Sequence, residues 1–322
     1  SLEKTQLHVG GVGDGRLWAI TCYFNPVGFK RRLSNYRIFR ANLAVPLVTV
    51  ELSFDGRFEL TDDDADILIQ LSGGAVLWQK ERLLNIAVKS VPQNAKNIAW
   101  LDCDVIFERP DWMHEAEQKL SEANVVQLYS ELVDLGPEGY QANGQHHEVR
   151  PSGHSIVSAI NSSGLEQLDA AVESGKNIRQ PFPTGMAWAA RRKILEGHGL
   201  YDAMIIGGGD RAMVHAMYGQ FEVPLLHLNK PRQEHYLRWA RGYHSEVAGK
   251  IGNGSGRIFH LWHGNFMNRN SRGRQRLLAG FDYDPDLDLR IGPNGAWHWA
   301  RPRPDLEDFL RKYFLSRAED DQ

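Results

Sequence analysis

The chain has 322 residues, 42% of them hydrophobic, which is enough to bury one large core. A formal net charge of −3 excludes a general basic field that would draw nucleic acid; only a local basic stretch, residues 269–276, leaves such a partner open. No apolar run approaches the roughly 20 residues that a membrane-spanning helix needs, so we expect no transmembrane segment, a cytoplasmic location and at most peripheral membrane attachment.

The first third of the chain alternates strand-like and helix-like segments. Apolar, β-branched runs predict strands, and apolar residues at helical spacing between Arg and Lys predict helices. We predict strands at 17–23, 45–52, 65–71 and 97–107, and helices at 29–43 and 79–90. Such alternation is typical of a parallel sheet covered on both faces. The expected fold class is α/β, with a Rossmann-like, mostly parallel mixed sheet flanked by helices.

The remaining chain has weaker patterns. We predict helices at 111–123, 191–197 and 210–218, and strands at 124–129, 184–190 and 258–263. Glycine-rich residues 136–153 predict a surface loop, and 249–256 a mobile loop. No shift in composition marks a linker, so we expect one domain over 17–301. An N-terminal extension, 1–16, precedes it, and an amphipathic helix that frays into an acidic tail, 302–322, follows.

Two cysteines, Cys22 and Cys103, fall in apolar runs, which predicts buried free thiols and fits a reducing compartment.

Asp102 and Asp104 interrupt the apolar run IAWLDCDVIF, residues 98–107. In an open α/β sheet, ligands bind outside the carboxyl ends of the strands. A strand alternates its faces, so both side chains should share one face, where two carboxylates repel unless a cation or hydrogen-bond donors lie between them. A divalent metal with a nucleoside diphosphate meets that need. The alternative is a pair of solvated aspartates at a strand end.

His260 and His263 lie three residues apart in a predicted short strand or turn. Neutral imidazoles bind divalent metals and could complete a shell that Asp104 begins. The alternatives are structural histidines, or a cationic pair that binds phosphate.

Three consecutive glycines, Gly207 to Gly209, precede Asp210. Glycine allows unusual backbone angles and close approach of a ligand. Asp210 could cap a helix, the commoner use, or face an acceptor pocket as a general base. Neither a Walker A sequence nor a G-x-G-x-x-G after the first strand is present, which disfavours a kinase or a dehydrogenase.

In this order the motifs resemble the metal-dependent glycosyltransferases of the GT-A fold, especially the β-1,4-galactosyltransferase-like inverting enzymes and related bacterial and phage glycosyltransferases. The chain departs from that pattern at Gly209, where the family has glutamate, and at Arg211 and Ala212, which are usually acidic. The matching pieces are residues 80–85 (KERLLN), 102–104 (DCD), 184–188 (TGMAW), 199–202 (GLYD), 207–210 (GGGD) and 260–263 (HLWH).

The resemblance implies a nucleotide-binding half at 17–110, an acceptor half at 111–301 and a UDP-sugar as the expected donor. Mn²⁺ or Mg²⁺ would be held by Asp104, His260 and His263, and Asp210 would be the catalytic base towards a glycan or another hydroxyl-bearing acceptor. Donor contacts are expected from Thr21, Tyr23, Glu51, Trp78, Lys80, Arg82 and Asp102. For Glu51 an ion pair with Arg or Lys is the alternative.

Two other functions stay open. A nucleotidyltransferase acting on a sugar phosphate would share the sheet and the metal, but it usually needs a loop rich in glycine and basic residues after the first strand, and residues 25–32 (NPVGFKRR) contain one glycine. A non-catalytic carbohydrate-binding protein would use Trp262, Trp297 and Trp299 as stacking platforms, but it would leave the aspartates without a role.

Overall fold

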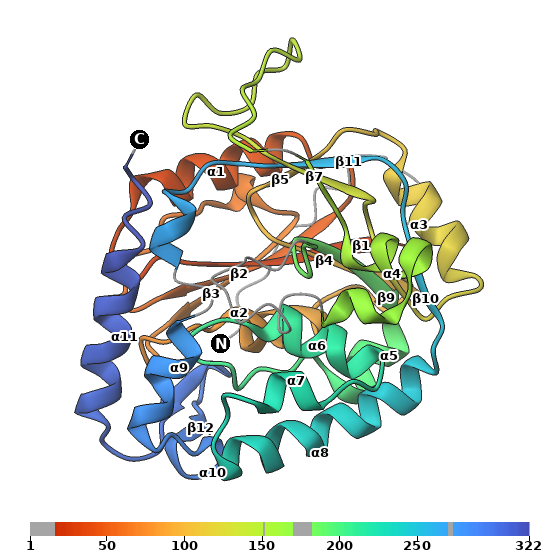
Figure 1. Ribbon diagram of the computed structural model, residues 1–322. Helices are drawn as coiled ribbons and strands as arrows, with labels where there is room; N and C mark the ends of the chain where they lie inside the picture. The colour runs from red at the N-terminus through yellow and green to blue at the C-terminus, as the bar shows by residue number, and fades with distance from the viewer. Residues whose placement is uncertain (1–16, 151, 170–181, 270–272, 322) are drawn as a thin grey trace.

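A seven-stranded mixed sheet lies at the centre of the molecule, in the strand order β10-β6-β9-β4-β1-β2-β3, with helices on both faces (Figure 1). The computed structural model describes residues 17–150, 152–169, 182–269 and 273–321, so the predicted extension at 1–16 falls outside the described residues. The strands are β1 (Leu17–Phe24), β2 (Leu47–Ser53), β3 (Ile67–Ser72), β4 (Asn97–Leu101), β6 (Val125–Gln127), β9 (Ala187–Arg191) and β10 (Ile251–Asn253).

Parallel pairing dominates this sheet. β1 pairs in parallel with β2 and β4, β2 with β3, and β10 with β6, whereas β9 is antiparallel to both of its neighbours. Every residue of β2 is buried, which is the burial expected of a parallel strand covered on both faces. The α/β class and the mostly parallel mixed sheet are confirmed.

A second sheet, in the order β5-β11-β7-β8, stands beside the carboxyl end of β4, and a two-stranded sheet pairs β12 with β13. Their strands are β5 (Val105–Phe107), β7 (Glu131–Asp134), β8 (Gly153–His154), β11 (Arg257–His260), β12 (Leu289–Ile291) and β13 (Trp297–Trp299).

Helices pack around these sheets. They are α1 (Lys30–Ala41), α2 (Lys80–Val88), α3 (Trp112–Leu120), α4 (Ile156–Ser163), α5 (Arg192–His198), α6 (Gly209–Met217), α7 (Glu222–Leu225), α8 (Lys230–Val247), α9 (Arg274–Leu278), α10 (Pro285–Asp288) and α11 (Pro304–Ser316). None of the helices in the described part of the chain is long and apolar enough to cross a membrane.

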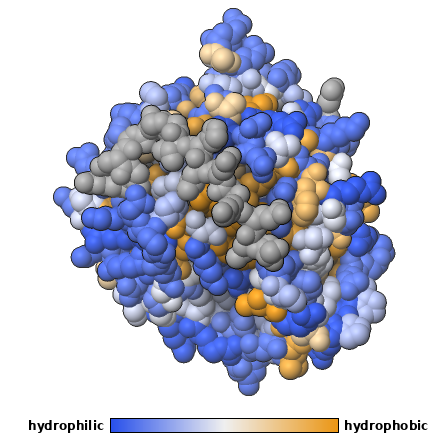
Figure 2. Space-filling view, turned by 180° about the vertical axis from the view of Figure 1, so that it is seen from behind, coloured by the Kyte–Doolittle hydropathy of each residue, from blue (hydrophilic) through white to orange (hydrophobic). Residues whose placement is uncertain are grey.

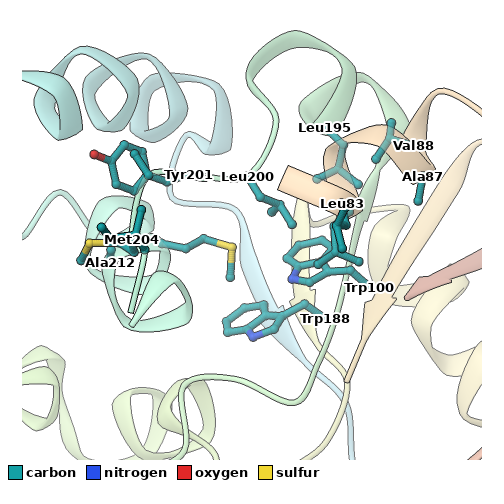
Figure 3. Packing of buried hydrophobic residues seen from close by; sticks show 14 of the residues in the cluster. Leu83, Ala87, Val88, Trp100, Trp188, Leu195, Leu200, Tyr201, Met204 and Ala212 are labelled. Carbon is teal, nitrogen blue, oxygen red and sulfur yellow. The ribbon is translucent and has the colours of Figure 1, made fainter. Parts of the chain in front are cut away.

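β4 shows how the sheet divides the core. Ile98 and Trp100 belong to the larger apolar cluster on one face, whereas Ala99 and Leu101 belong to the cluster on the other face. In the larger cluster Trp100 stacks on Trp188 of β9, with ring centroids 6.3 Å apart. Leu83, Ala87 and Val88 of α2 pack beside this pair (Figure 3). On the surface seen in Figure 2, apolar side chains form scattered patches among hydrophilic ones.

The predicted strand at 97–107 is wrong as a single element. The chain leaves the central sheet after Leu101, makes a turn through residues 102–104, and enters the second sheet as β5, which pairs antiparallel with β11. The predicted shared face of Asp102 and Asp104 is therefore wrong too. In a turn, the two carboxylates can point to different polar partners. A pleated strand buried on both faces could not provide such partners for them.

Two further expectations differ from the structure. The predicted mobile loop at 249–256 contains β10, which is stabilised by parallel pairing with β6. The predicted fraying tail after α11 is instead anchored, because Arg317 and Glu319 are buried. The predicted loop at 136–153 is largely irregular and projects from the body of the molecule (Figure 1).

Trp188→Ala should cost about 3–5 kcal/mol of unfolding free energy, because the fully buried indole leaves a cavity and its stacking partner Trp100 loses contact. Denaturant unfolding measures this. Phe58→Ala, at a side chain that is 40% exposed, is the matched control and should change stability by less than about 0.5 kcal/mol. Equal losses in the two variants would contradict the proposed core.

Candidate metal and donor site

Asp104, His260 and His263 converge where the second sheet meets the end of β4. Asp104 Oδ2 lies 3.4 Å from His260 Nε2 and 3.5 Å from His263 Nε2, and the two Nε2 atoms are 3.1 Å apart. One oxygen and two nitrogens, all within 4.8 Å of one another, could hold a metal ion. The structure thus brings together the three residues that the sequence analysis predicts as metal ligands.

Asp134, which the sequence did not indicate, orients His260 from behind. It is the partner of His260 in the β7–β11 pairing, and its Oδ1 lies 2.8 Å from His260 Nδ1. A ring whose Nδ1–H donates to a carboxylate presents Nε2 to a metal. Asp134 also pairs with Arg150. Burial alone would raise the pKa of Asp134, but the hydrogen bond and charge of His260, together with Arg150, lower it to about 2.

The electrostatics of the cluster favour a cation. Burial would lower the pKa of His260, yet the charge of Asp104 and the hydrogen bonds to Asp104 and Asp134 raise it to about 9. Burial would raise the pKa of Asp104, but the charge and hydrogen bond of His260 lower this pKa below its usual value. The pKa of His263 is held well below its usual value by burial and by nearby positive charges, first that of Arg269. His263 is therefore a neutral imidazole with a lone pair to offer.

The residues present fit a divalent ion. Asp104 Oδ1 is buried and has no hydrogen-bond partner among the described residues, so one carboxylate oxygen is available beside two imidazoles. Such a mixed set binds a first-row transition ion more tightly than Mg²⁺, which prefers oxygen ligands. Mn²⁺ suits this donor set better than Mg²⁺.

Lys80 forms a second cluster with the other aspartates. From the first turn of α2, its Nζ lies 2.7 Å from Asp102 Oδ1 and 2.9 Å from Asp210 Oδ2. Burial would lower the pKa of Lys80, but the two carboxylates hold it well above its usual value. Burial raises the pKa of Asp102 to about 6 against the opposing charge of Lys80. Asp102 thus faces Asp210 rather than the metal ligands.

Asp210 lies in the first turn of α6, after the N-cap residue Gly208, so Asp210 is not the capping residue. It is also packed against Gly185, where an added Cβ would lie 2.6 Å from Asp210 Oδ2. The interpretation of Asp210 as a helix cap is therefore wrong, and its carboxylate forms an ion pair with Lys80.

Glu81, which the sequence also missed, fills the space beside Gly209. A Cβ built on Gly209 would overlap the Glu81 carboxylate, so the glycine is what admits this side chain. Glu81 is 5% exposed, and its Oε2 has no hydrogen-bond partner among the described residues. Burial raises the pKa of Glu81 to about 8. The family that the sequence resembles has an acidic residue at the position of Gly209. In this chain Glu81 of α2 lies beside that position.

Arg82 and Asn85 point away from the Lys80 cluster. Arg82 pairs with Asp202 at 2.8 Å and its guanidinium lies over the Trp297 ring. Asn85 hydrogen-bonds both the N–H and the carbonyl of Leu200. In this structure Arg82 therefore fixes the 199–202 turn to α2.

A cleft of about 880 Å³ opens at the carboxyl ends of β1 and β2. Tyr23 and Glu51 line it. Tyr23 donates its hydroxyl to Glu59 at 2.9 Å, and Glu51 accepts hydrogen bonds from the Glu59 and Leu60 amides and from Gln70. The alternative of an Arg or Lys partner for Glu51 is not what the structure shows.

Two other predicted donor contacts lie outside the cleft lining. Thr21 is 1% exposed and donates to the Leu101 carbonyl at 2.7 Å. Trp78 stacks on Phe314 of α11, and the guanidinium of Arg317 lies over the Trp78 ring, 5.1 Å from the ring centroid. Both side chains are occupied by packing in this structure.

Comparison with known proteins gives no matching family model and no match among curated proteins. Solved structures with similar folds include the mannosyltransferase PcManGT from Pyrobaculum calidifontis in complex with GDP-Man and Mn²⁺, at 14% identity and a TM-score of 0.36, covering 94% of this chain and 86% of that one. S. aureus TarS 1–349 matches at 12% identity and a TM-score of 0.33, covering 61% of this chain and 53%, about half, of that one.

A putative glucose-1-phosphate thymidylyltransferase from Bacillus anthracis, in complex with a sucrose, matches at 8% identity and a TM-score of 0.35, covering 87% of this chain and 98% of that one. Likenesses this weak assign no function, so the function proposed below depends on the residues of this chain.

Asp134→Asn should weaken Mn²⁺ binding by about 10–100-fold, because His260 loses the carboxylate that orients its ring. Isothermal titration of Mn²⁺ measures this. Glu131→Gln, at the other end of β7, is the control and should bind Mn²⁺ like the parent. An unchanged affinity in Asp134→Asn would contradict the orienting role.

Glu81→Gln should make the protein more stable than the parent at neutral and alkaline pH. The pKa of Glu81 is raised in the fold, so the parent loses stability as pH rises from about 4.5 to about 8, while the neutral glutamine does not. Denaturant unfolding at several pH values should give curves that coincide below pH 4.5 and separate above it. A constant difference across this range would count against a buried, titrating Glu81.

Proposed function

We propose that the protein is a divalent-metal-dependent glycosyltransferase of the GT-A type, which moves a sugar from a nucleotide-sugar donor, a UDP-sugar, to a hydroxyl of a glycan or another acceptor. The observation that carries the proposal is the convergence of Asp104, His260 and His263 next to a second, carboxylate-bearing cluster at the carboxyl edge of the sheet. Ligand sites of open α/β sheets lie at this edge.

Asp104, His260 and His263 would hold Mn²⁺ or Mg²⁺, with the donor set favouring Mn²⁺. When bound, such an ion supplies Lewis-acid stabilisation of the negative charge on the leaving diphosphate. Tyr23 and Glu51 line the cleft in which we expect the nucleoside. Glu51 already accepts three hydrogen bonds, so we assign it to shaping this cleft.

Asp210 is the proposed base. Its carboxylate, whose Oδ2 lies 2.9 Å from Lys80 Nζ, can accept the proton of the acceptor hydroxyl as that oxygen attacks the anomeric carbon. Attack from the face opposite the leaving group gives inversion in one displacement. Lys80 also ties Asp210 to Asp102 on the turn that carries Asp104, so the base and the metal ligands are held at a fixed spacing.

Asp104→Ala should abolish Mn²⁺-dependent transfer or hydrolysis of a nucleotide sugar while the protein stays folded, because the residue supplies the oxygen of the ligand set. Release of UDP from UDP-sugars, with circular dichroism alongside, measures both. Asp308→Ala, at an exposed carboxylate on α11, is the control. Undiminished turnover in folded Asp104→Ala would refute the metal role, and a preference for a nucleoside triphosphate would favour the nucleotidyltransferase.

Asp210→Asn should reduce transfer by roughly 10²–10⁴-fold, the usual contribution of a general base, and should leave donor affinity nearly unchanged. Single-turnover transfer and calorimetric titration of UDP separate the two quantities. Weaker UDP binding with normal chemistry would contradict the assignment of Asp210 as base.

A further inference from the structure

The carboxylate of Glu319 is enclosed by two guanidinium groups. Arg32 donates from Nε to Oε2 at 2.7 Å and from Nη2 to Oε1 at 2.9 Å, and Arg317 donates from Nε to Oε1 at 2.7 Å. The side chains of Glu319, Arg317 and Arg32 are only 2%, 6% and 15% exposed. One carboxylate thus faces two buried positive charges, which leaves the group of three with an excess positive charge.

This group lies between the end of β1 and the metal-ligand turn. Arg32, in the first turn of α1, also donates to the carbonyl of Phe24, the last residue of β1. A Cβ built on Gly264, the residue after His263, would lie 2.9 Å from the carbonyl oxygens of Arg317 and Ala318. The arginines therefore adjoin both the sheet edge and the cluster formed by Asp104, His260 and His263.

A third guanidinium, Arg269, belongs to the same neighbourhood. Tyr313 donates to the Arg269 carbonyl and accepts from Arg317 Nη1 at 3.2 Å, so the two arginines are joined through one residue. Arg269 Nε is buried without a hydrogen-bond partner among the described residues. The positive charge here is more than one carboxylate requires, which suits an anion that carries several negative charges.

The segment that carries Glu319 lies beyond α11 and contacts the body through Glu319, Asp320 and the Asp321 carbonyl. It leaves α11 through Ala318, whose φ of +45° is a left-handed conformation that disfavours any residue but glycine. Asp320 accepts hydrogen bonds from the Lys30 and Arg31 amides at 3.1 and 2.8 Å, which caps α1 from the far end of the chain. In Figure 1, α11 runs along one edge of the molecule and the chain ends beside α1.

We propose that Arg32 and Arg317 form a binding site for the diphosphate of the nucleotide donor, and that Glu319 occupies this site as a resident carboxylate that the diphosphate displaces. The identity of the ligand rests on the proposed function. Guanidinium groups bind carboxylate and phosphate with the same paired hydrogen bonds, so one can replace the other. Displacement requires only the residues after Arg317 to move, because α11 ends at Ser316 and Arg317 directly follows it.

A purely structural ion pair and a displaceable one predict opposite effects of removing the Glu319 charge. Glu319→Gln keeps the shape of the side chain and removes the competing anion, so pyrophosphate and UDP should bind about tenfold tighter, equivalent to about 1.4 kcal/mol. Asp308→Asn, at an exposed carboxylate of α11 that pairs with Lys312, is the control and should change these affinities less than about twofold. Arg32→Gln should weaken both ligands.

Calorimetric titration of each folded variant with pyrophosphate, inorganic phosphate and UDP, with and without Mn²⁺, measures these affinities. Pyrophosphate and UDP should gain together, and single phosphate should gain less because it offers fewer oxygens to two arginines. An equal or weaker pyrophosphate affinity in Glu319→Gln overturns the proposal, and so does an unchanged affinity in Arg32→Gln.

A measurement on the parent protein covers the case in which a variant fails to fold. Pyrophosphate should increase amide hydrogen exchange in residues 319–321, because the bound anion releases the tail. Unchanged or increased protection of these amides overturns the proposal. Tighter pyrophosphate binding by Glu319→Gln without any sugar transfer would support this anion site and refute the proposed glycosyltransferase activity. Mn²⁺-dependent transfer with no change in pyrophosphate affinity would support the glycosyltransferase activity and refute the anion site.

Discussion

The structure depends on how two half-buried carboxylates are compensated at one turn. Asp102 and Asp104 follow an apolar strand into the interior, where an unpaired charge costs several kcal/mol. Lys80 compensates Asp102, and the His260 imidazole compensates Asp104. Each partner comes from a different element, α2 in one case and β11 in the other. The need to pair these two charges is what draws the helix, the second sheet and the glycine loop to a common edge.

Much of this arrangement follows from local sequence pattern. The apolar runs of β1 and β2 and the helical spacing in α2 are strong enough to predict the layered sheet, and the aspartates indicate the edge at which we propose the metal and donor site. The long helix α8 was open to the same analysis, because its buried residues Tyr236, Ala240, Tyr243 and Val247 repeat at helical spacing. Two arginines and one histidine lie between these four residues and lower the apolar signal of that stretch, and no prediction was made for it.

Other features depend on contacts that no local pattern reveals. Asp134 meets His260 across 126 residues, and Glu319 meets Arg32 across 287. An acidic residue near the end of a chain usually indicates a solvated tail, and only the folded positions of α1 and α11 turn Glu319 into a buried anion. The same holds for Glu81, whose place beside Gly209 depends on the packing of α2 against the glycine loop.

The break between β4 and β5 has a mechanical consequence. β4 ends at Leu101 and β5 begins at Val105, so Asp102, Cys103 and Asp104 form the turn between the two sheets. Because Asp102 contacts Lys80 and Asp104 contacts His260, this turn of three residues joins the two clusters through the backbone. An insertion or deletion in the turn would therefore displace the imidazole cluster relative to the Lys80 cluster.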